Sequence, residues 1–354
     1  AGGSVGQLCP APAAAAALVA RGWEGRLVTD TRGLRHAPDF PAVAVDEIHA
    51  ASPSTKNPVK LAKAALELTQ GFAQARAIAG KWKPDVVAGF GGYPAFPALA
   101  VARSMGTPFA IHEQNAVPGF TNKLLARFAN QVFEAFPNTF PRAEKVVHTG
   151  NPLRKEIAVL AQQARSISAA GAPLKILVLG GSQGALAINQ IVPELLSHWS
   201  AENRPSVRHQ AGERTLDETL ALYRERGLDT AQSIEVFPFI SDMAEAYSWA
   251  DLVICRSGAS TVSEIAAAGL PSILIPYPHH SDQQQKHNAN WLVGSGAAIL
   301  LEQKDLTLPA LKTLVMDLHE NRNKLQQMSD IARSIAISDA DEVIARRCLE
   351  LANA

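Results

Sequence analysis

The sequence predicts an α/β fold of two Rossmann-like domains, each built on a parallel sheet. The chain has 354 residues, of which 47% are hydrophobic, and this is enough apolar material for two cores. Short β-branched segments alternate with Ala- and Leu-rich segments, as in repeated βαβ units. The alternation stops at an Asn-Pro turn, Asn151 and Pro152, and then starts again, so we expect two consecutive domains.

The strands are expected in two sets, one on each side of this turn. The first set is Arg26–Asp30, Ala42–Asp46, Asp85–Phe90, Phe109–Glu113, Gln131–Phe136 and Lys145–Thr149. The second set is Leu174–Leu179, Ser206–Gln210, Ser233–Phe237, Leu252–Cys255 and Ser272–Ile275. From about Ile331 the chain has the pattern of an amphipathic helix.

These elements define the expected domains. The N-terminal domain comprises residues 1–149, the C-terminal domain comprises 150–334, and a final helix, 335–354, packs back on the first domain. Parallel sheets bind ligands beyond the carboxyl ends of their strands, so we expect the two sheets to face a cleft.

Composition argues against several classes of protein. The chain carries 33 basic and 33 acidic residues, which argues against a general nucleic-acid binder. Its three cysteines are widely spaced, so we expect a reducing compartment and no disulfide framework or zinc cluster. We find no signal-peptide pattern and no apolar run near the ~20 residues that span a bilayer. We therefore expect a cytosolic protein or one on a membrane surface.

The segment Gly180–Ala185, GGSQGA, follows a buried strand and opens a helix. Its backbone N–H groups and the helix dipole would bind an anion, or the glycines only let strand and helix pack. The segment is not GxGxxG, and the next strand ends in Gln210 rather than in the acidic residue that holds the ribose of NAD. A phosphate is therefore favoured over a dinucleotide.

A second junction of this kind, RSGASTVSEIAAAG, spans residues 256–269. Thr261 and Glu264 have the spacing of a capping box, which would make Glu264 a structural residue. The alternative is that Glu264 accepts hydrogen bonds from a ribose diol. Arg256 stands at a strand end, where we expect it to meet a ligand or the opposite domain.

Three further loops carry polar residues. Gln284 and Gln285 follow a strand of the second half and could bind sugar hydroxyls. His112 and Glu113 are the acid–base pair of a loop in the first half, although a lone histidine is more often a buried structural residue. The chain opens with AGGSVGQLCP, a glycine-rich turn of the kind that follows a strand, so we expect a strand before it.

Several segments, in this order, resemble the signature segments of the MurG family: GGYPAFP, HEQNAVPG, GNPLR, GGSQGA, RSGASTVSEIAAAGLP and DQQQKHNA. The resemblance covers nearly the whole chain. It implies the glycosyltransferase-B fold, with a UDP-sugar-binding C-terminal domain and an N-terminal domain on the acceptor and membrane side. It also implies a bacterial transferase of peptidoglycan synthesis, which adds N-acetylglucosamine to the lipid-linked muramyl-pentapeptide and converts lipid I into lipid II.

The resemblance also assigns roles to individual positions. Ser182 would contact the UDP phosphates, the Ile240 backbone would bind uracil, and Glu264 would bind the ribose. Gln285, with Gln284, would hold hydroxyls of the sugar. The complete set implied to bind substrate is Ser4, Val5, Gly6, Asn115, Arg154, Ser182, Ile240, Ala259, Ser260, Thr261, Val262, Ser263, Glu264, Gln284 and Gln285.

The opening turn departs from the family pattern. Where the family has GGTGGH, this chain has GGSVGQ, so Ser4 replaces a threonine, Val5 a glycine and Gln7 the histidine that acts as general base. An amide accepts no proton near neutral pH, so we expect Gln7 to position the acceptor without deprotonating it and the activity to be reduced. Glu113 is then the candidate substitute base.

The implied reaction is a single displacement with inversion, in which the muramyl 4-hydroxyl attacks the anomeric carbon and UDP departs. The implied partners are UDP-N-acetylglucosamine, undecaprenyl-pyrophosphoryl-muramyl-pentapeptide and an anionic membrane surface at the cytoplasmic face of the bacterial inner membrane. Neither a metal, a cofactor nor a nucleic acid is implied. The alternatives are a UDP-sugar-binding homologue with impaired turnover, and another UDP-sugar enzyme of this fold such as a 2-epimerase.

One stretch of the first half has the charge of a membrane contact. Between residues 56 and 83 only Glu67 is acidic, whereas the basic residues are Lys56, Lys60, Lys63, Arg76, Lys81 and Lys83. Leu61, Ala65, Leu68 and Phe72 fall at helical spacing within it, although packing against the core is the more common cause of such a stripe.

Overall fold

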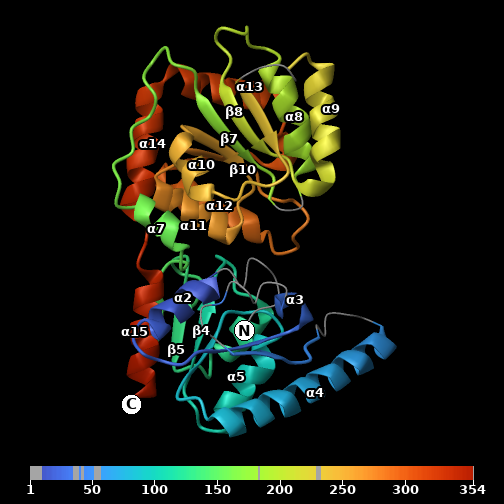
Figure 1. Ribbon diagram of the computed structural model, residues 1–354, viewed down its shortest axis with the longest axis vertical. Helices are drawn as coiled ribbons and strands as arrows, with labels where there is room; N and C mark the ends of the chain where they lie inside the picture. Colours follow the sequence, from blue (N-terminus) through green and yellow to red (C-terminus); the bar gives the residue numbers. More distant parts are fainter. Residues whose placement is uncertain are drawn as a thin grey trace. The chain divides into compact units, whose positions relative to one another are not determined.

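A computed structural model describes residues 10–34, 40, 44–51, 57–181, 184–228 and 233–353 (Figure 1). The predicted site residues Ser4, Val5, Gly6, Gln7 and Ser182 lie outside the described residues, as do Lys56 and the side chains of Lys60 and Leu61. The chain forms two compact units, an N-terminal unit of Ala1–Arg154 with Ile337–Ala354, and a C-terminal unit of Lys155–Ala336. The divisions fall after Arg154 and Ala336, whereas we expected them after residues 149 and 334.

The N-terminal unit contains two parallel sheets, where the sequence predicted one. Strand β1 (Arg26–Thr29) pairs with β2 (Ala44–Glu47), and β3 (Val87–Gly89), β4 (Phe109–Glu113), β5 (Gln131–Glu134) and β6 (Val146–His148) form the second sheet in that order. A cavity of about 540 Å³ is lined by Leu27 of β1, Val87 of β3 and apolar residues of four helices. Residues of β1 and β3, which belong to different sheets, therefore line the same cavity.

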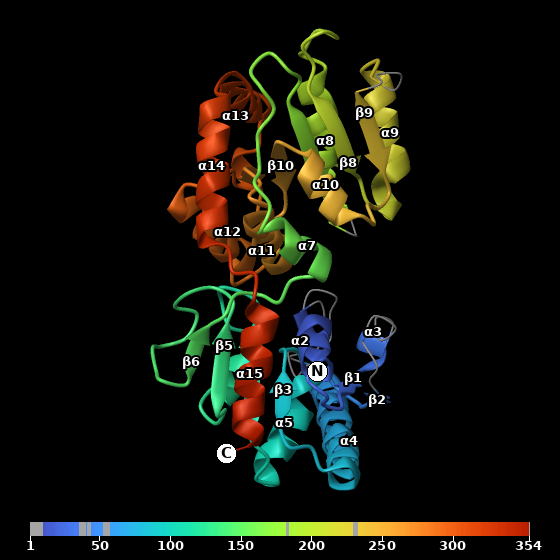
Figure 2. The same cartoon turned by 60° about the vertical axis from the view of Figure 1, so that its left-hand side comes forward.

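The helices of the N-terminal unit are α2 (Pro10–Val19), α3 (Thr31–Leu34), α4 (Pro58–Trp82), α5 (Ala95–Ser104), α6 (Phe120–Leu125) and α15 (Ala340–Ala352). The long helix α4 packs on α5, where the rings of Phe72 and Phe96 meet edge to face with centroids 5.7 Å apart. Helix α15 lies beside α2 and contacts β4 (Figures 1 and 2). The end of the chain therefore belongs to the core of its first half.

The C-terminal unit has one sheet in the order β12-β11-β10-β7-β8-β9, with every pairing parallel. Its strands are β7 (Lys175–Leu179), β8 (Ser206–Gln210), β9 (Ile234–Phe237), β10 (Leu252–Cys255), β11 (Ser272–Leu274) and β12 (Ala298–Leu300). All four residues of β10 and the last four of β7 are buried. Central parallel strands with helices on both faces need apolar residues on both faces, which explains the nearly continuous apolar runs.

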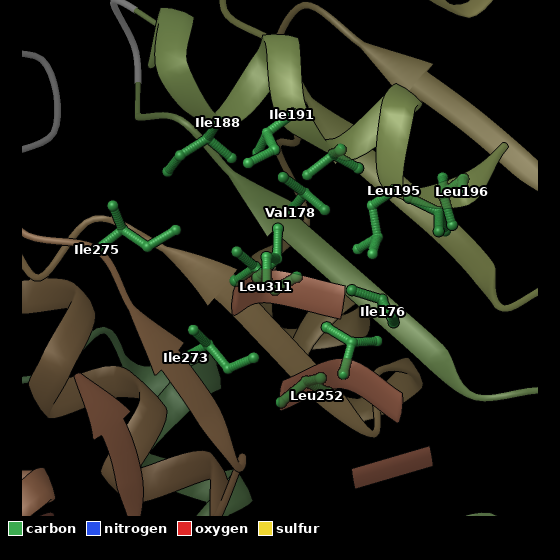
Figure 3. Packing of buried hydrophobic residues seen from close by; sticks show 14 of the residues in the cluster. Ile176, Val178, Ile188, Ile191, Leu195, Leu196, Leu252, Ile273, Ile275 and Leu311 are labelled. Atoms are coloured by element: carbon green, nitrogen blue, oxygen red, sulfur yellow. The ribbon is translucent and has the colours of Figure 1, made fainter. Parts of the chain in front are cut away.

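The helices of this unit are α7 (Lys155–Leu160), α8 (Leu186–Leu196), α9 (Leu216–Glu225), α10 (Met243–Trp249), α11 (Ala259–Ala268), α12 (Gln284–Ser295), α13 (Leu308–Glu320) and α14 (Arg322–Ile335), with single turns at Glu213–Thr215 and Gln303–Asp305. On one face of β7, Ile176 and Val178 pack with Ile188 and Ile191 of α8 (Figure 3). Two alternate residues of a strand point to the same face, so this packing places α8 along β7.

Two features differ from the prediction. Strand β12 was not predicted; its three residues form an edge strand of the sheet, and their β conformation depends on pairing with β11. The single tail helix predicted from Ile331 is two helices, since Ala336 adopts an extended conformation with ψ 141° and ends α14. Helix α14 packs on α11 in the C-terminal unit and α15 packs on α2 in the N-terminal unit, so the break lets each helix join a different core.

Candidate active site

The C-terminal unit places its predicted donor-binding segments at one edge of its sheet. Strands β7 to β11 end at Leu179, Gln210, Phe237, Cys255 and Leu274, and in a parallel sheet the carboxyl ends lie at the same edge. The segments that follow are the glycine-rich turn, the loop with Ile240, the start of α11 and the start of α12.

The glycine-rich turn after β7 requires glycine at Gly184. Its backbone has φ +77°, and a Cβ there would lie 2.2 Å from Thr215 Oγ1 and 2.5 Å from Ala211 O. The following residue, Ala185, is the N-cap of α8 and provides no side-chain cap. The N–H groups of Leu186 and Ala187 in the first turn of α8 therefore have no side-chain cap from Ala185, and anion binding at this segment stays a prediction.

A buried polar network lies between α8, β8 and α9. The two ring nitrogens of His209 lie 3.0 Å from Tyr223 Oη and 3.1 Å from Asn189 Oδ1, and Asn189 Nδ2 donates to Ala211 O at 2.9 Å. Burial lowers the pKa of His209 to about 3, so the ring is neutral at physiological pH. These contacts satisfy the polar groups beneath the carboxyl end of β8.

The neutral, buried His209 predicts that the C-terminal unit loses stability in mild acid. The pKa in the unfolded chain is about 6.5, above the folded value, so the unfolded state binds more protons and stability falls as pH drops below that value. At pH 5 the loss amounts to about 2 kcal/mol. His209→Gln should reduce the fall in the thermal unfolding midpoint between pH 7.5 and pH 5. His198→Gln changes an exposed histidine and should leave this fall as it is in the wild type. Equal pH dependence of all three proteins would contradict this assignment.

Gln210 has a function that its sequence position did not reveal. The sequence suggested only that it could not bind the ribose of NAD. In the structure its side-chain Oε1 accepts a hydrogen bond from the Ile240 N–H at 3.1 Å, and the side chain is buried. Gln210 therefore fixes the loop after β9, whose backbone was predicted to bind uracil.

The capping-box interpretation of Glu264 is wrong. Helix α11 begins at Ala259, its N-cap is Gly258, and no side chain caps it. Glu264 consequently lies in the second turn of α11, beyond reach of the N-cap backbone, and not at the third helical position that a capping box requires. Its Oε2 instead accepts a hydrogen bond from the Tyr247 hydroxyl at 2.9 Å.

Two other polar residues at this edge are engaged within the unit. Arg256 was expected to meet a ligand or the opposite domain, but its guanidinium donates to Ile275 O and Pro276 O, both at 3.0 Å, and to Gln303 Oε1 at 2.6 Å. Burial lowers its pKa. Gln285 Oε1 accepts from the Tyr277 N–H at 2.9 Å, which fixes this side chain at the start of α12 next to Gln284.

In the N-terminal unit, Glu113 ends β4 and holds the loop that follows. Its side chain accepts hydrogen bonds from the N–H and Nδ2 of Asn115 at 3.1 and 3.4 Å, from the Gly119 N–H at 3.0 Å and from Asn122 Nδ2 at 2.9 Å. Burial raises its pKa, and only 3% of the residue is exposed. Since both carboxylate oxygens already accept from donors inside the loop, the geometry favours a positioning role over proton transfer.

Three other predicted residues of this unit are described by the structure, and two of them, His112 and Asn115, lie at or directly after the end of β4. His112 Nε2 lies 3.1 Å from Gly150 O, and burial lowers the pKa of His112 to about 4, so this histidine is a structural residue. Asn115 is half-buried and is oriented by Glu113. Arg154, also half-buried, is the last residue of this unit before the chain crosses to the next one.

Family models, a solved structure and a curated relative each match this chain over much of its length and identify its family. Models of the glycosyltransferase family 28 N-terminal and C-terminal domains match residues 1–134 and 175–344. The crystal structure of MurG from Acinetobacter baumannii has a TM-score of 0.82 and 35% identity, covering 99% of this chain and 97% of that one. A Maricaulis maris protein is 49% identical over 350 residues, 98% of this chain and 95% of the relative. The chain belongs to the MurG family.

Further comparisons support the assignment of the chain to the MurG family. The Maricaulis relative and a Pseudomonas paraeruginosa relative, 42% identical over 99% of this chain and 97% of its own length, are both named UDP-N-acetylglucosamine–N-acetylmuramyl-(pentapeptide) pyrophosphoryl-undecaprenol N-acetylglucosamine transferase. A structure of a UDP-N-acetylglucosamine 2-epimerase from Listeria monocytogenes matches with TM-score 0.66 at 13% identity, covering 96% of this chain and 92% of that one. At that identity the likeness concerns the glycosyltransferase-B fold alone.

Sequence reasoning missed three residues that contact the predicted site residues. Tyr247, Gln210 and Asn122 each bond a residue or backbone group that the sequence had singled out. Tyr247 and Asn122 lie within helices and carry no motif of their own. Gln210 was recognisable as a polar residue at a strand end, which is the one sequence signal that could have led to it.

Proposed function

We propose that this chain transfers N-acetylglucosamine from UDP-N-acetylglucosamine to the 4-hydroxyl of lipid-linked muramyl-pentapeptide, with inversion, which converts lipid I into lipid II. The observation that carries the proposal is the end-to-end similarity, at 49% identity, to a relative that bears this transferase's name. The arrangement of the predicted donor-binding segments at one sheet edge supports it.

The donor belongs to the C-terminal unit in this proposal. The diphosphate lies at the glycine-rich turn with Ser182 and at the N-terminus of α8, whose N–H groups meet the charge that develops as UDP leaves. The Ile240 backbone binds uracil, and the first turns of α11 line the nucleotide with Ala259, Ser260, Thr261, Val262, Ser263 and Glu264. Gln284 and Gln285 bind hydroxyls of the transferred sugar.

The acceptor belongs to the N-terminal unit. Ser4, Val5 and Gly6 of the opening turn contact substrate, Gln7 stands at the position of the general base, and Asn115 and Arg154 complete the binding set. Glu113 was the candidate substitute base. We now propose that it orients Asn115, because its oxygens accept hydrogen bonds from Asn115, Gly119 and Asn122.

Transfer of labelled N-acetylglucosamine from UDP-N-acetylglucosamine to a lipid-linked muramyl-pentapeptide tests the proposal. We expect a labelled disaccharide lipid and release of UDP, at a rate reduced by Gln7. Binding of UDP without transfer would identify the impaired homologue. Formation of a 2-epimer of the free nucleotide sugar, without use of the lipid acceptor, would identify the epimerase alternative and overturn the proposal.

We also propose that the chain works at the cytoplasmic face of the bacterial inner membrane as a peripheral protein. Within the described ranges, no helix is both long enough and apolar enough to span a bilayer. The helix α6 region exposes three large apolar side chains four residues apart, Phe120 (68%), Leu124 (39%) and Phe128 (43%). Lys123 and Arg127 are exposed between them. Apolar residues alternating with cations suit an interface with anionic lipid.

The stretch predicted from charge, residues 56–83, fits a membrane contact less well. Its proposed stripe is partly wrong, because Ala65 is exposed while Phe72 packs on Phe96 of α5. Lys63 and Leu66 are exposed, so a smaller contribution of α4 is compatible with the structure.

The membrane proposal predicts a specific loss of vesicle binding. Phe120→Ser with Leu124→Ser should reduce cosedimentation with anionic vesicles by about 10-fold or more, because two apolar side chains no longer enter the interface. Val59→Ser with Leu66→Ser, which removes two exposed apolar side chains from α4, is the matched control and should have a smaller effect. A larger loss of vesicle binding in the α4 variant would show that α4, and not the α6 region, forms the main membrane contact.

A further inference from the structure

We infer that Tyr247 is a positioning residue that orients the Glu264 carboxylate toward the ribose of the donor nucleotide, and thereby sets the preference for a ribonucleotide. The inference rests on the proposed function, which gives Glu264 the ribose contact. It adds a residue from a different helix to the nucleotide site.

The contact itself has an unambiguous direction. Tyr247 lies in α10, only 1% of it is exposed, and its hydroxyl oxygen is 2.9 Å from Glu264 Oε2. The Tyr247 hydroxyl is the donor and Glu264 Oε2 is the acceptor. A wholly buried ring keeps its hydroxyl in one place, because the surrounding packing allows one rotamer.

Glu264 needs such support to act as a ligand. Its side chain is half-buried, has three rotatable bonds, and does not take part in capping α11, whose N-cap is Gly258. When one carboxylate oxygen is held by a fixed donor, the second oxygen, Oε1, points in one direction. A ribose diol that meets a pre-oriented acceptor loses less of its binding energy to ordering the side chain.

The alternative is that the bond only ties α10 to α11. The two helices are secured in other ways. Helix α10 is capped by Asp242, whose Oδ1 accepts from the Glu245 N–H at 2.9 Å. Helix α11 packs on α7, α12 and α14. Because other contacts hold both helices in place, we assign the Tyr247–Glu264 hydrogen bond to the orientation of the carboxylate.

Calorimetric binding of UDP and of 2′-deoxy-UDP to the full chain tests the inference. The wild type should prefer UDP by about 10-fold or more, and Glu264→Ala should abolish this preference. Tyr247→Phe removes only the hydroxyl; it should weaken UDP binding by about 3- to 10-fold and reduce the preference for UDP. In the Glu264→Ala background Tyr247→Phe should have no further effect on either affinity.

Tyr223→Phe is the matched control, because Tyr223 is equally buried in the same unit but bonds His209. It can lower the unfolding midpoint, but it should leave the preference for UDP unchanged. If Tyr247→Phe shifts only the unfolding midpoint while Glu264→Ala loses the preference, the inference about Tyr247 fails and the donor site stands. If the wild type binds both nucleotides equally, the ribose role of Glu264 fails and the inference falls with it.

Discussion

Histidine at position 7, combined with Val5→Gly, is expected to raise kcat by about 10²-fold or more while the affinity for UDP-N-acetylglucosamine stays nearly unchanged. In the proposed mechanism the acceptor hydroxyl must lose a proton as it attacks, and an imidazole can accept that proton whereas the Gln7 amide cannot. Val5→Gly accompanies it because a β-branched residue is poorly tolerated wherever a glycine-rich turn requires a positive φ. Steady-state kinetics with saturating donor and acceptor measure the effect.

Two single variants separate the contributions. Val5→Gly alone supplies no base and should change kcat little. Gln7→His alone supplies the base while Val5 remains, and should give part of the gain. A double variant that binds UDP as the wild type does, and still shows no rise in kcat, would exclude position 7 as the site of the general base.

Glu113→Gln should lower kcat/KM for the acceptor by about 10²-fold and leave UDP affinity unchanged. The amide would place an NH2 group where the carboxylate now accepts hydrogen bonds, so Asn115 would shift, and a displacement of about 1 Å costs this much. Loss of the charged acceptor should also destabilise the N-terminal unit by about 2–3 kcal/mol. Kinetics and thermal unfolding measure the two effects separately.

The pH profile distinguishes positioning from proton transfer. If Glu113 orients Asn115, the residual activity of Glu113→Gln keeps the acidic limb of the wild-type profile. If Glu113 is the base, that limb disappears. Glu134→Gln is the matched control, because Glu134 is buried at the end of the neighbouring strand β5 and accepts from the Asn138 and Phe140 N–H groups at 3.0 and 2.9 Å. If both variants lose activity equally, Glu113 affects the kinetics only through the stability of the unit.

Much of the fold was predictable from local pattern. Strands β8 and β10 were predicted with the observed bounds, and for β10 the continuous apolar run LVIC is a strong signal for a buried parallel strand. The edge strand β12 was not predicted, and the two sheets of the N-terminal unit were expected as one. Edges and pairings depend on residues far apart in the sequence, which local periodicity does not report.

For the site, the sequence was sufficient to select candidate segments, because glycines, amides and a carboxylate at strand ends form recognisable motifs. The contacts of each side chain became known only from the tertiary structure. Glu264 is bonded by Tyr247 rather than by a cap, and the oxygens of Glu113 accept from its own loop. A hydrogen bond joins atoms within about 3 Å whatever their separation in the chain, so the partner of a polar group becomes known only when the helices and strands have packed.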